Sequence, residues 1–474
     1  MSSSRKITLQ QFCITHVCNE HESNAERITL QENVNYWIKK DEAICVNGQM
    51  IKENMYNFLP IILNSDGSPW HQSVLFVLDK AKNDFNYNPA TYHCIISDLT
   101  NFKNFLDENK IDLYDFPEQK LLRPTYQYRN YLVLKIQSGK LSSQTVKRRV
   151  STMILFYRFL IREKFFAPQN IPWSENEVYI NTFDKIGFSY NVKKTKTDLS
   201  IKTPVDIDPF TKNILDEGRL RPLELDEQSA LIDVLIKLEN TEMLLIHLIA
   251  LFTGARIQTV LTLKKTTFLK DIKNHNTEVR ILTGNGTGID TKRDKNIILI
   301  LPLWLYEKIR IYVFSKRSSD RVKKSNCHLF SDYLFLSNRG TPYYIGKEHL
   351  KKPYLNNNVH TLHNGEAVRQ FIKKRVLPLM KEKLNNPGYN YKYHDLRATF
   401  GMNLTSSLLT SVEQEKTTLH EAREYVKCRM GHLSSSTTDL YLNYRNDLSN
   451  YNAYQESYEL YLNKIAEKIW RNET

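Results

Sequence analysis

Three segments in the second half of the sequence combine cationic and proton-carrying side chains at spacings that could perform chemistry. The first, LFTGARIQTVLTL, places Arg256 after an apolar helical stretch and a Thr-Gly turn, which is a fairly rigid support. The second, YKYHDLRATFGMNL, carries His394 and Arg397, which share one helix face at their i, i+3 spacing. The third, MGHLSSSTTDLYLNY, carries His432 and Tyr441. Because a histidine beside an arginine can bring two cations together, the second segment indicates a bound anion.

The elements that must position these residues alternate helices with a short β-rich stretch. RPLELDEQSALIDVLIKL begins with a proline and acidic residues, which is typical of a helix start, and TEMLLIHLIALF also has a helical pattern. VRILT and NIILILPL are β-rich and are separated by the turn-rich GNGTGIDTKRDK, so a hairpin is expected there. Residues 218–450 are therefore predicted to form a mixed α/β domain that carries the site.

A helical domain is expected to precede it at residues 69–166. Apolar residues recur every three or four positions in NPATYHCIISDLTNFKNFLDENK, and a second helix from 143 to 164 carries a basic face. A solvated surface is the ordinary explanation of such a face, but its excess of arginine, which grips phosphate with two hydrogen bonds, favours DNA. The candidate DNA-binding residues are Lys147, Arg148, Arg149, Arg158 and Arg162 on this helix, and Lys193, Lys194 and Lys196 in the basic run KKTKTD.

Three further segments lie outside these two domains. Residues 1–68 show no strong periodicity and receive no role. Residues 167–217 lose periodicity and contain several prolines, which is typical of a linker. Residues 451–474 have the pattern of a separate amphipathic helix, which either packs on its own domain or docks onto a neighbouring protomer.

Each of the three chemistry-bearing segments is weak evidence alone, but their order and spacing resemble the catalytic boxes of the tyrosine recombinases, or phage-integrase family. Thr253–Arg256 is similar to the family's Thr-Gly-x-Arg box, which carries the first phosphate-clamping arginine. His394–Arg397 matches its His-x-Leu-Arg box. Gly431-His432, followed by Tyr441, matches the box of the Gly-His pair and the nucleophilic tyrosine. The likeness is strong over 218–445 and weak over 69–166.

The resemblance implies a site-specific recombinase or integrase, and it does not separate a phage integrase, an integrase of a transposon or genomic island, and a dimer resolvase. Such an enzyme cleaves and rejoins DNA through a covalent 3′-phosphotyrosyl intermediate. The fold implied is mainly α with a small β-sheet, in which a helical DNA-binding domain and an α/β catalytic domain form a clamp on DNA. The implied partners are double-stranded DNA at specific recombination sites, a homotetramer in the synaptic complex and accessory DNA-bending proteins.

This chemistry accounts for the residue types in the boxes. Arg256 and Arg397 supply forked donors that keep their charge near neutral pH, where the non-bridging oxygens of a phosphodiester gain negative charge. His394 and His432 can donate hydrogen bonds and move protons. The phenol of Tyr441 is a weak nucleophile at its ordinary pKa, near 10, and cationic surroundings would stabilise its phenolate. The phosphotyrosine conserves the bond energy, so rejoining needs neither ATP nor metal.

The leaving 5′ oxygen also needs a proton, which in the family comes from a lysine on a β-hairpin. Lys292 and Lys295 are the candidates here, and Lys292 is preferred because TKRDKNIILIL resembles the family's lysine turn before an apolar strand. Two features depart from the family pattern. Thr259 stands where an acidic residue is usual, and the stretch between Leu404 and Met430 is longer than usual.

Composition narrows the partners and the cofactors. The formal charge of +14 and the pI of about 9.2 favour a polyanion such as nucleic acid over an anionic membrane surface. The N-terminus lacks the apolar core of a signal peptide and no apolar run is long enough for a bilayer, so a cytoplasmic protein without membrane contact is expected. GNGTG matches neither a dinucleotide fingerprint nor a P-loop, so no cofactor is expected.

No metal is expected either. The cluster Cys13, His16, Cys18 and His21 could supply zinc ligands, but its spacing matches none of the common structural zinc patterns, and ordinary surface and core residues are favoured.

Two alternative functions stay open. A type IB topoisomerase would use the same tyrosine chemistry for DNA relaxation, although the Gly-His box and the separate helical domain favour a recombinase. A catalytically inactive DNA-binding regulator is disfavoured because all the expected catalytic residue types are present.

Overall fold

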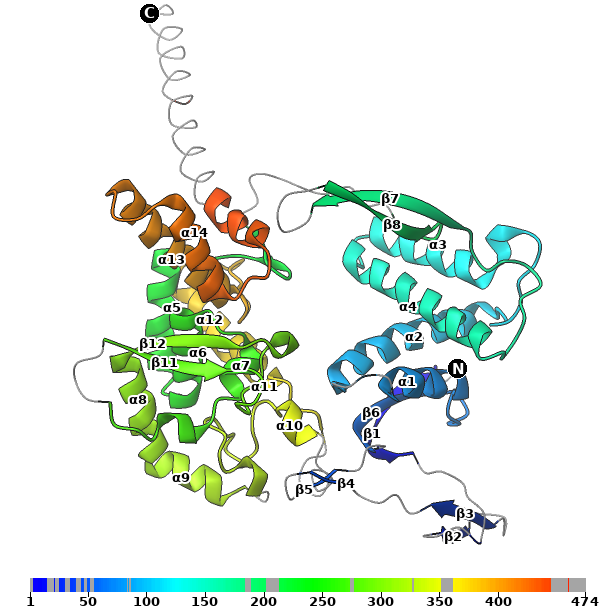
Figure 1. Cartoon of the computed structure of the whole chain (residues 1–474), viewed down its shortest axis with the longest axis horizontal. Helices are drawn as coiled ribbons and strands as arrows, with labels where there is room; N and C mark the ends of the chain where they lie inside the picture. The colour runs from blue at the N-terminus through cyan, green and yellow to red at the C-terminus, as the bar shows by residue number, and fades with distance from the viewer. Residues whose placement is uncertain are drawn as a thin grey trace, which may run out of the picture. The chain divides into compact units, whose positions relative to one another are not determined.

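The chain consists of two compact units, Met1–Asp206 with Lys351–Leu362 and Ile207–Leu350 with His363–Thr474 (Figure 1). Helices predominate, and the sheets among the described residues are two-stranded and antiparallel, which confirms the mainly α fold with small β-sheets. The computed structural model describes residues 3–14, 21, 25–29, 35–39, 44–46, 49–51, 55–82, 84, 87–183, 189–201, 213–272, 277–325, 328–350, 361–444 and 459.

Four helices build the core of the first unit. They are α1 (His71–Lys82), α2 (Pro89–Asn109), α3 (Pro124–Gln137) and α4 (Ser143–Arg162). Helix α2 starts at a proline, whose missing N–H costs nothing in a first turn, and Asn88 caps it through the backbone N–H of Ala90. The apolar stripes of α2 and α4 face inward, where Ile96, Leu99 and Phe156 are fully buried.

The N-terminal segment adds strands to this unit. Strand β1 (Arg5–Cys13) pairs with β6 (Met55–Leu63), and the pair lies against α2, where the hydroxyl of Ser4 donates to Asp107. Of the candidate zinc ligands Cys13, His16, Cys18 and His21, the two middle ones, His16 and Cys18, lie outside the described residues, so the cluster is not described as a site. Two short hairpins complete the segment: β2 (Ala25–Thr29) with β3 (Asn35–Lys39), and β4 (Ile44–Val46) with β5 (Gln49–Ile51).

The range 167–217, expected to be a linker, contains regular structure. Strands β7 (Glu175–Phe183) and β8 (Ser189–Thr197) form an antiparallel ribbon next to α3 and α4 (Figure 1). Arg158 of α4 pairs with Glu175, and the hydroxyl of Tyr126 of α3 donates to Asp198 just after β8. Much of β8 is exposed, so the ribbon lacks the alternation of buried and exposed residues that would predict strands from the sequence.

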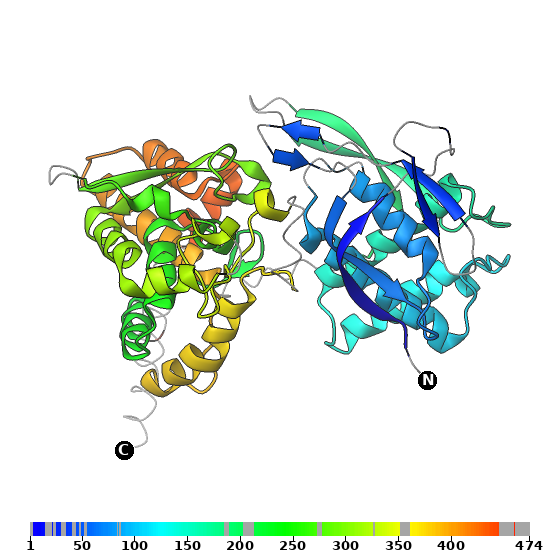
Figure 2. The ribbon, with the colours of Figure 1, turned by 90° about the horizontal axis from the view of Figure 1, so that it is seen from below.

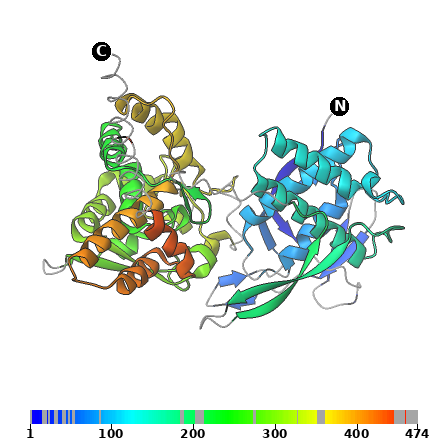
Figure 3. The same ribbon diagram turned by 90° about the horizontal axis from the view of Figure 1, so that it is seen from above.

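The second unit contains the predicted hairpin. Strands β11 (Glu278–Thr283) and β12 (Ile297–Pro302) pair in antiparallel register, which confirms this element. Val279 and Ile281 face the core, whereas Leu282 and Ile298, which are paired across the ladder, are exposed. The hairpin accordingly lies at the edge of the helices rather than between them (Figures 2 and 3).

Helices make up the rest of the second unit's core. Helix α13 packs against α6 and α14, and residues 435–444 form one more helix after α14. The unusually long stretch between Leu404 and Met430 is occupied by the continuation of α13 and by α14. The helices are α5 (Leu225–Lys237), α6 (Thr241–Thr253), α7 (Ile257–Leu261), α8 (Leu303–Phe314), α9 (Lys316–Lys323), α10 (Lys347–Leu350), α11 (Glu366–Phe371), α12 (Leu377–Lys383), α13 (Asp395–Glu413) and α14 (Leu419–Met430).

Two expectations concerned helices: an amphipathic helix at 451–474 and the absence of a membrane-spanning helix. Apart from Glu459, the expected helix at 451–474 lies outside the described residues. Among the residues that are described, no helix combines the length and the apolar character needed to cross a bilayer.

Candidate active site

Arg256 is positioned by the glycine that ends α6. Gly254 has a φ of 65°, the left-handed conformation that closes many helices, and a Cβ there would lie 2.5 Å from Phe400 Cδ1. The turn therefore needs glycine for both its backbone conformation and its packing. Arg256 follows as the N-cap residue of α7, so a short rigid turn holds it between two helices, as the sequence predicts.

Arg397 lies in the first turn of α13 and is buried, with 3% of its surface exposed. Its Nη1 donates to the carbonyl of Gly254 at 2.9 Å, and its Nη2 donates to the carbonyl of Met430. The guanidinium thus joins the three chemistry-bearing segments to one another. Its Nε donates to Asp216 at 3.2 Å, a residue that the sequence analysis did not single out.

Asp216 lies in the turn between β9 (Ile214–Leu215) and β10 (Arg219–Leu220). Its Oδ2 accepts hydrogen bonds from Arg397 Nε at 3.2 Å, from His432 Nε2 at 3.3 Å and from the hydroxyl of Tyr441 at 3.0 Å. Burial opposes ionisation of this carboxyl, but the hydrogen bond from His432 and the charge of Arg397 hold its pKa well below its usual range. One carboxylate oxygen therefore gathers an arginine, a histidine and a tyrosine.

The hydrogen bonds of His432 define its tautomer. An ionised carboxylate can only accept, so Nε2 carries the proton that is shared with Asp216. Nδ1 lies 3.0 Å from the hydroxyl of Thr438, which can donate to it. The imidazole also stacks on the ring of Tyr441, with centroids 5.6 Å apart and planes inclined by 30°. These contacts fix His432 with its Nε2–H directed at Asp216 Oδ2.

Tyr441 is fully buried on the helix 435–444. Its ring lies so close to Gly401 of α13 that a Cβ there would be 2.5 Å from Tyr441 Cε1. Burial, followed by the charge of Asp216, raises the pKa of the phenol above its ordinary value. In this arrangement the hydroxyl is a hydrogen-bond donor to a carboxylate and not a phenolate.

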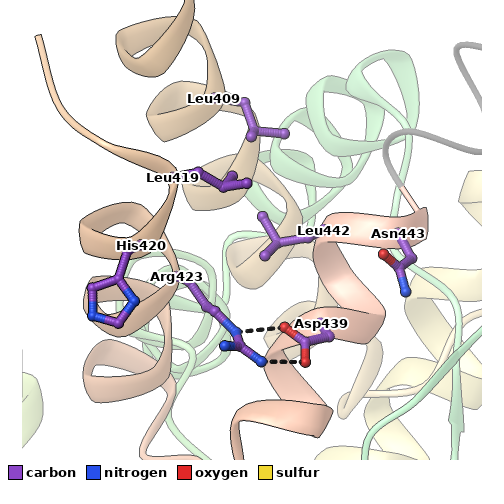
Figure 4. A pocket seen from close by; sticks show the side chains of 7 residues that line it. All are labelled: Leu409, Leu419, His420, Arg423, Asp439, Leu442 and Asn443. Carbon is purple, nitrogen blue, oxygen red and sulfur yellow. Dashed lines mark hydrogen bonds and ion pairs between the residues drawn. The ribbon is translucent and has the colours of Figure 1, made fainter. Parts of the chain in front are cut away.

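An ion pair fixes the helix that carries Tyr441. Arg423 of α14 forms two hydrogen bonds with Asp439, two residues before Tyr441 (Figure 4). Both residues line a pocket of about 700 Å³, together with Leu442 and Asn443 from the same helix. The remaining lining residues are Leu409, Leu419 and His420.

Glu217, the next residue in the same turn, collects two further predicted residues. Its carboxylate accepts from Arg256 Nε at 3.1 Å and lies 2.9 Å from Lys292 Nζ. Burial opposes ionisation, but the hydrogen bond from Lys292 and the charge of Arg256 lower the pKa of Glu217. Lys295 donates instead to the carbonyl of Gly431 at 3.2 Å, and burial, followed by the charge of Arg256, lowers its pKa.

His394 completes the predicted set as the residue that precedes α13. Burial, followed by the charge of Arg397, lowers its pKa to about 4, and the charges of Asp216 and Arg256 also act on it. The imidazole is therefore neutral near pH 7 and cannot share the cationic role of the arginines in this arrangement. Thr259, which stands at the family's usual acidic position, is buried in α7.

Asp216 and Glu217 were not predicted as site residues, because both lie in the range 167–217, which was interpreted as a linker. The one local signal is the turn-forming Asp-Glu-Gly between the short strands, which is compatible with a hairpin. Nothing in the local sequence indicates that these carboxylates meet side chains up to 225 positions away.

The candidate DNA-binding arginines of α4 have partners within the first unit. Arg148 forms two hydrogen bonds with the buried Asp98 of α2, at 2.8 and 2.9 Å, and Arg149 donates to Asn101. Arg158 and Arg162 pair with acidic residues of β7 and α1, respectively. Each of these four arginines thus has a partner within the unit, and Arg148, Arg158 and Arg162 are about half exposed.

The lysines of β8 are placed differently. Lys193 pairs with Glu177 across the ribbon at 2.6 Å, whereas Lys194 and Lys196 are exposed and occupy alternate positions of the strand. Alternate residues of a strand face the same side, so these two charges share one face of the ribbon. They are better positioned to reach a phosphate backbone than the arginines of α4.

Replacing Lys194 and Lys196 together by alanine is expected to weaken DNA binding and to flatten its salt dependence. The slope of log K against log salt should fall by about 1.8, because each phosphate contact contributes about 0.9. The Lys110→Ala/Lys164→Ala variant removes the same charge elsewhere in this unit and serves as the control. A slope unchanged by the β8 pair would remove the ribbon from the DNA interface.

Arg148→Ala should lower the free energy of unfolding, since Asp98 loses its main partner.

Comparisons with known proteins give one structural likeness to report. Neither a protein-family model nor a curated protein matches the sequence. The solved structure of the Tn1549 transposon integrase, in complex with transposon right end DNA, is 12% identical over 78% of this chain and 94% of that chain, with a TM-score of 0.42. A likeness at this level assigns neither a family nor an activity to this chain. The chain is similar, distantly, to a transposon integrase bound to DNA.

Proposed function

We propose that the chain is a site-specific DNA recombinase or integrase that cleaves and rejoins DNA through a covalent 3′-phosphotyrosyl intermediate on Tyr441. One observation supports this most directly. Side chains from distant segments, each chosen from the sequence for phosphodiester chemistry, converge on one pair of adjacent carboxylates. They are Arg397, His432 and Tyr441 at Asp216, and Arg256 and Lys292 at Glu217.

In the proposed reaction a phosphodiester binds where Arg397, His432 and Tyr441 converge. Arg256, Arg397 and His432 would donate hydrogen bonds to its non-bridging oxygens and stabilise the charge that develops there. The oxygen of Tyr441 attacks phosphorus and gives its proton to the neutral His394 or to solvent, while the bond from phosphorus to the 5′ oxygen breaks. A lysine protonates the 5′ oxygen. The same steps in reverse, with a free 5′ hydroxyl as nucleophile, rejoin a strand and release the tyrosine.

The remaining predicted residues fit around these steps. Lys292 and Lys295 are both near the site, and either could deliver the proton to the leaving oxygen. His394, neutral near pH 7, could donate or accept a hydrogen bond at the phosphate. The exposed lysines of β8 would contact the DNA backbone. The proposed partners are double-stranded recombination sites and DNA-bending accessory proteins. The chain would act as a homotetramer in the synaptic complex.

The proposal is tested by covalent trapping in the presence of EDTA. Nicked duplexes that tile the DNA flanking the gene should yield a denaturant-resistant adduct, with protein on the 3′ phosphate and a free 5′ hydroxyl. Chelator should not affect the yield, because the arginines and histidines of the chain itself supply the charge stabilisation. An adduct that needs added magnesium, or cleavage products without bound protein, would contradict the mechanism.

The same adducts distinguish a recombinase from a type IB topoisomerase. A recombinase should join strands from two duplexes and form a tetrameric complex on DNA. Relaxation of a supercoiled plasmid by a monomer, without strand exchange between duplexes, would favour the topoisomerase instead.

A further inference from the structure

The turn of the β9–β10 hairpin places two consecutive carboxylates among the residues proposed for catalysis. The side chain of Asp216 is 2% exposed and that of Glu217 is 34% exposed. Both are negatively charged, because their cationic neighbours lower the pKa of each carboxyl despite burial. The site that should receive an anionic substrate thus already contains two anions from its own chain.

The contacts of Asp216 are those that a phosphate oxygen would need. A single oxygen, Oδ2, accepts from Arg397, His432 and Tyr441 at 3.0 to 3.3 Å. Carboxylate and phosphate oxygens use the same charge-assisted hydrogen bonds, and arginine forms them readily with both. A phosphate and Asp216 cannot hold the same three donors at once, and like charges so close together would repel strongly. DNA can therefore bind productively only if the carboxylate leaves.

The carboxylate also stabilises the site while DNA is absent. Arg397 is nearly fully buried, and a buried charge without a partner is costly. Asp216 supplies that partner, and Glu217 does the same for Arg256. Without DNA, the hairpin thus supplies the negative charge next to the buried arginines that a phosphate would supply in the complex.

The same contact opposes activation of the nucleophile. The hydroxyl of Tyr441 donates to Asp216, whose negative charge acts with burial to disfavour the phenolate. A phosphate surrounded by arginines in place of the carboxylate would leave the hydroxyl next to phosphorus. The contact therefore blocks substrate binding and chemistry together.

Displacement of the two carboxylates requires only the turn 216–218 to move, because Ile214 and Leu220 of the strands are buried in the core beside Phe400 and Tyr441. The strands of the hairpin contain two residues each, and the ladder consists of the pairs Arg219–Leu215 and Leu220–Ile214. Such short two-stranded ribbons have little stability of their own. The turn includes Glu217 in the left-handed region, with a φ of 57°, which is strained for a residue with a Cβ.

We propose that the β9–β10 hairpin is an internal substrate mimic: Asp216 and Glu217 occupy the phosphate position and keep the site inactive until DNA displaces them. This inference rests on the proposed function, because it takes a phosphodiester as the ligand of the site. It adds that the chain regulates its own site by an autoinhibitory contact.

The first test measures anion binding and does not depend on catalysis. Asp216→Asn keeps the size of the side chain and removes its charge, so inorganic phosphate or vanadate should bind this variant more tightly than wild type. If the open arrangement is populated at about 1–10%, apparent affinity should rise about 10- to 100-fold. Thermal unfolding measured against anion concentration reports the binding. Equal anion affinity in variant and wild type would overturn the mimic.

The second test measures adduct formation on nicked DNA below saturation. Asp216→Asn and Glu217→Gln should both form the adduct faster than wild type. Glu382→Gln, which removes an exposed acid elsewhere in the same unit, should change the rate much less. This control separates displacement of the mimic from a general gain in DNA affinity. Glu217 is partly exposed, so its variant remains informative if loss of Asp216 prevents folding.

The outcomes separate this inference from the proposed function. Adduct formation by wild type, with no gain in either variant, would overturn the mimic and leave the recombinase intact. A lower rate in Asp216→Asn with unchanged anion affinity would make Asp216 a positioning residue for His432 and Tyr441, against the proposal. The absence of an adduct from wild type and from both variants would count against the proposed function itself.

Discussion

Replacing Tyr441 by phenylalanine is expected to abolish the covalent adduct completely while the fold and most of the DNA affinity persist. The change removes only the hydroxyl, which is the proposed nucleophile and donates to Asp216 at 3.0 Å. The ring keeps its packing against Gly401 and Met430. Covalent trapping on nicked DNA measures the chemistry, and thermal unfolding together with a gel-shift titration measures the fold and the affinity.

Tyr444→Phe is the matched control, because Tyr444 lies on the same helix and is only partly buried. It should form the adduct as wild type does. An adduct that persists in Tyr441→Phe would shift the assignment to Tyr444. Tyr393, another tyrosine beside a catalytic box, is a poorer substitute, since its hydroxyl donates to the carbonyl of Ile246 inside the core.

Replacing Lys292 by alanine is expected to slow cleavage of normal DNA about 10²- to 10⁴-fold, the usual contribution of a general acid. A substrate with sulfur at the 5′ bridging position leaves without a proton, so its cleavage by Lys292→Ala should approach the wild-type rate. Single-turnover rates on both substrates measure this rescue. Arg397→Ala should gain far less from sulfur, because the charge that Arg397 stabilises lies on the non-bridging oxygens.

Lys295→Ala is the direct competitor in this experiment. Lys292 pairs with Glu217, whereas Lys295 donates to the carbonyl of Gly431. Burial, followed by the charge of Arg256, lowers the pKa of Lys295, which makes release of its proton easier. Sulfur rescue of Lys295→Ala, without rescue of Lys292→Ala, would move the general acid to Lys295. Rescue of neither variant would give the proton to His394 or to water and leave both lysines as DNA contacts.

The sequence was sufficient for features that depend on neighbouring residues. Two β-rich segments, VRILT and NIILILPL, on either side of the turn-rich GNGTGIDTKRDK predicted the β11–β12 hairpin, because strand propensity and turn residues act locally. The Thr-Gly turn predicted a rigid seat for Arg256, since only a glycine fits the left-handed turn against Phe400. The β7–β8 ribbon was missed because its largely exposed β8 leaves no apolar alternation to detect.

The sequence did not determine which partners the charged residues have. The basic face of α4 was interpreted as a DNA-binding candidate, yet its Arg148 is paired with Asp98, a buried residue of another helix. A charge run in a sequence has the same appearance whether its partners are solvent, phosphate or a distant carboxylate. Only the packing of α2 against α4 decided which partner Arg148 has.

By itself, then, the sequence determined the residue types of the site and the local elements that carry them, since periodicity and turn chemistry act over a few residues. Tertiary structure alone decided that Asp216 meets Arg397, His432 and Tyr441. That meeting depends on packing between segments far apart in the chain, and a single acidic turn carries no periodic signal of it. The physical reason is that burial of cations requires a nearby anion, but local sequence does not specify which carboxylate the fold brings there.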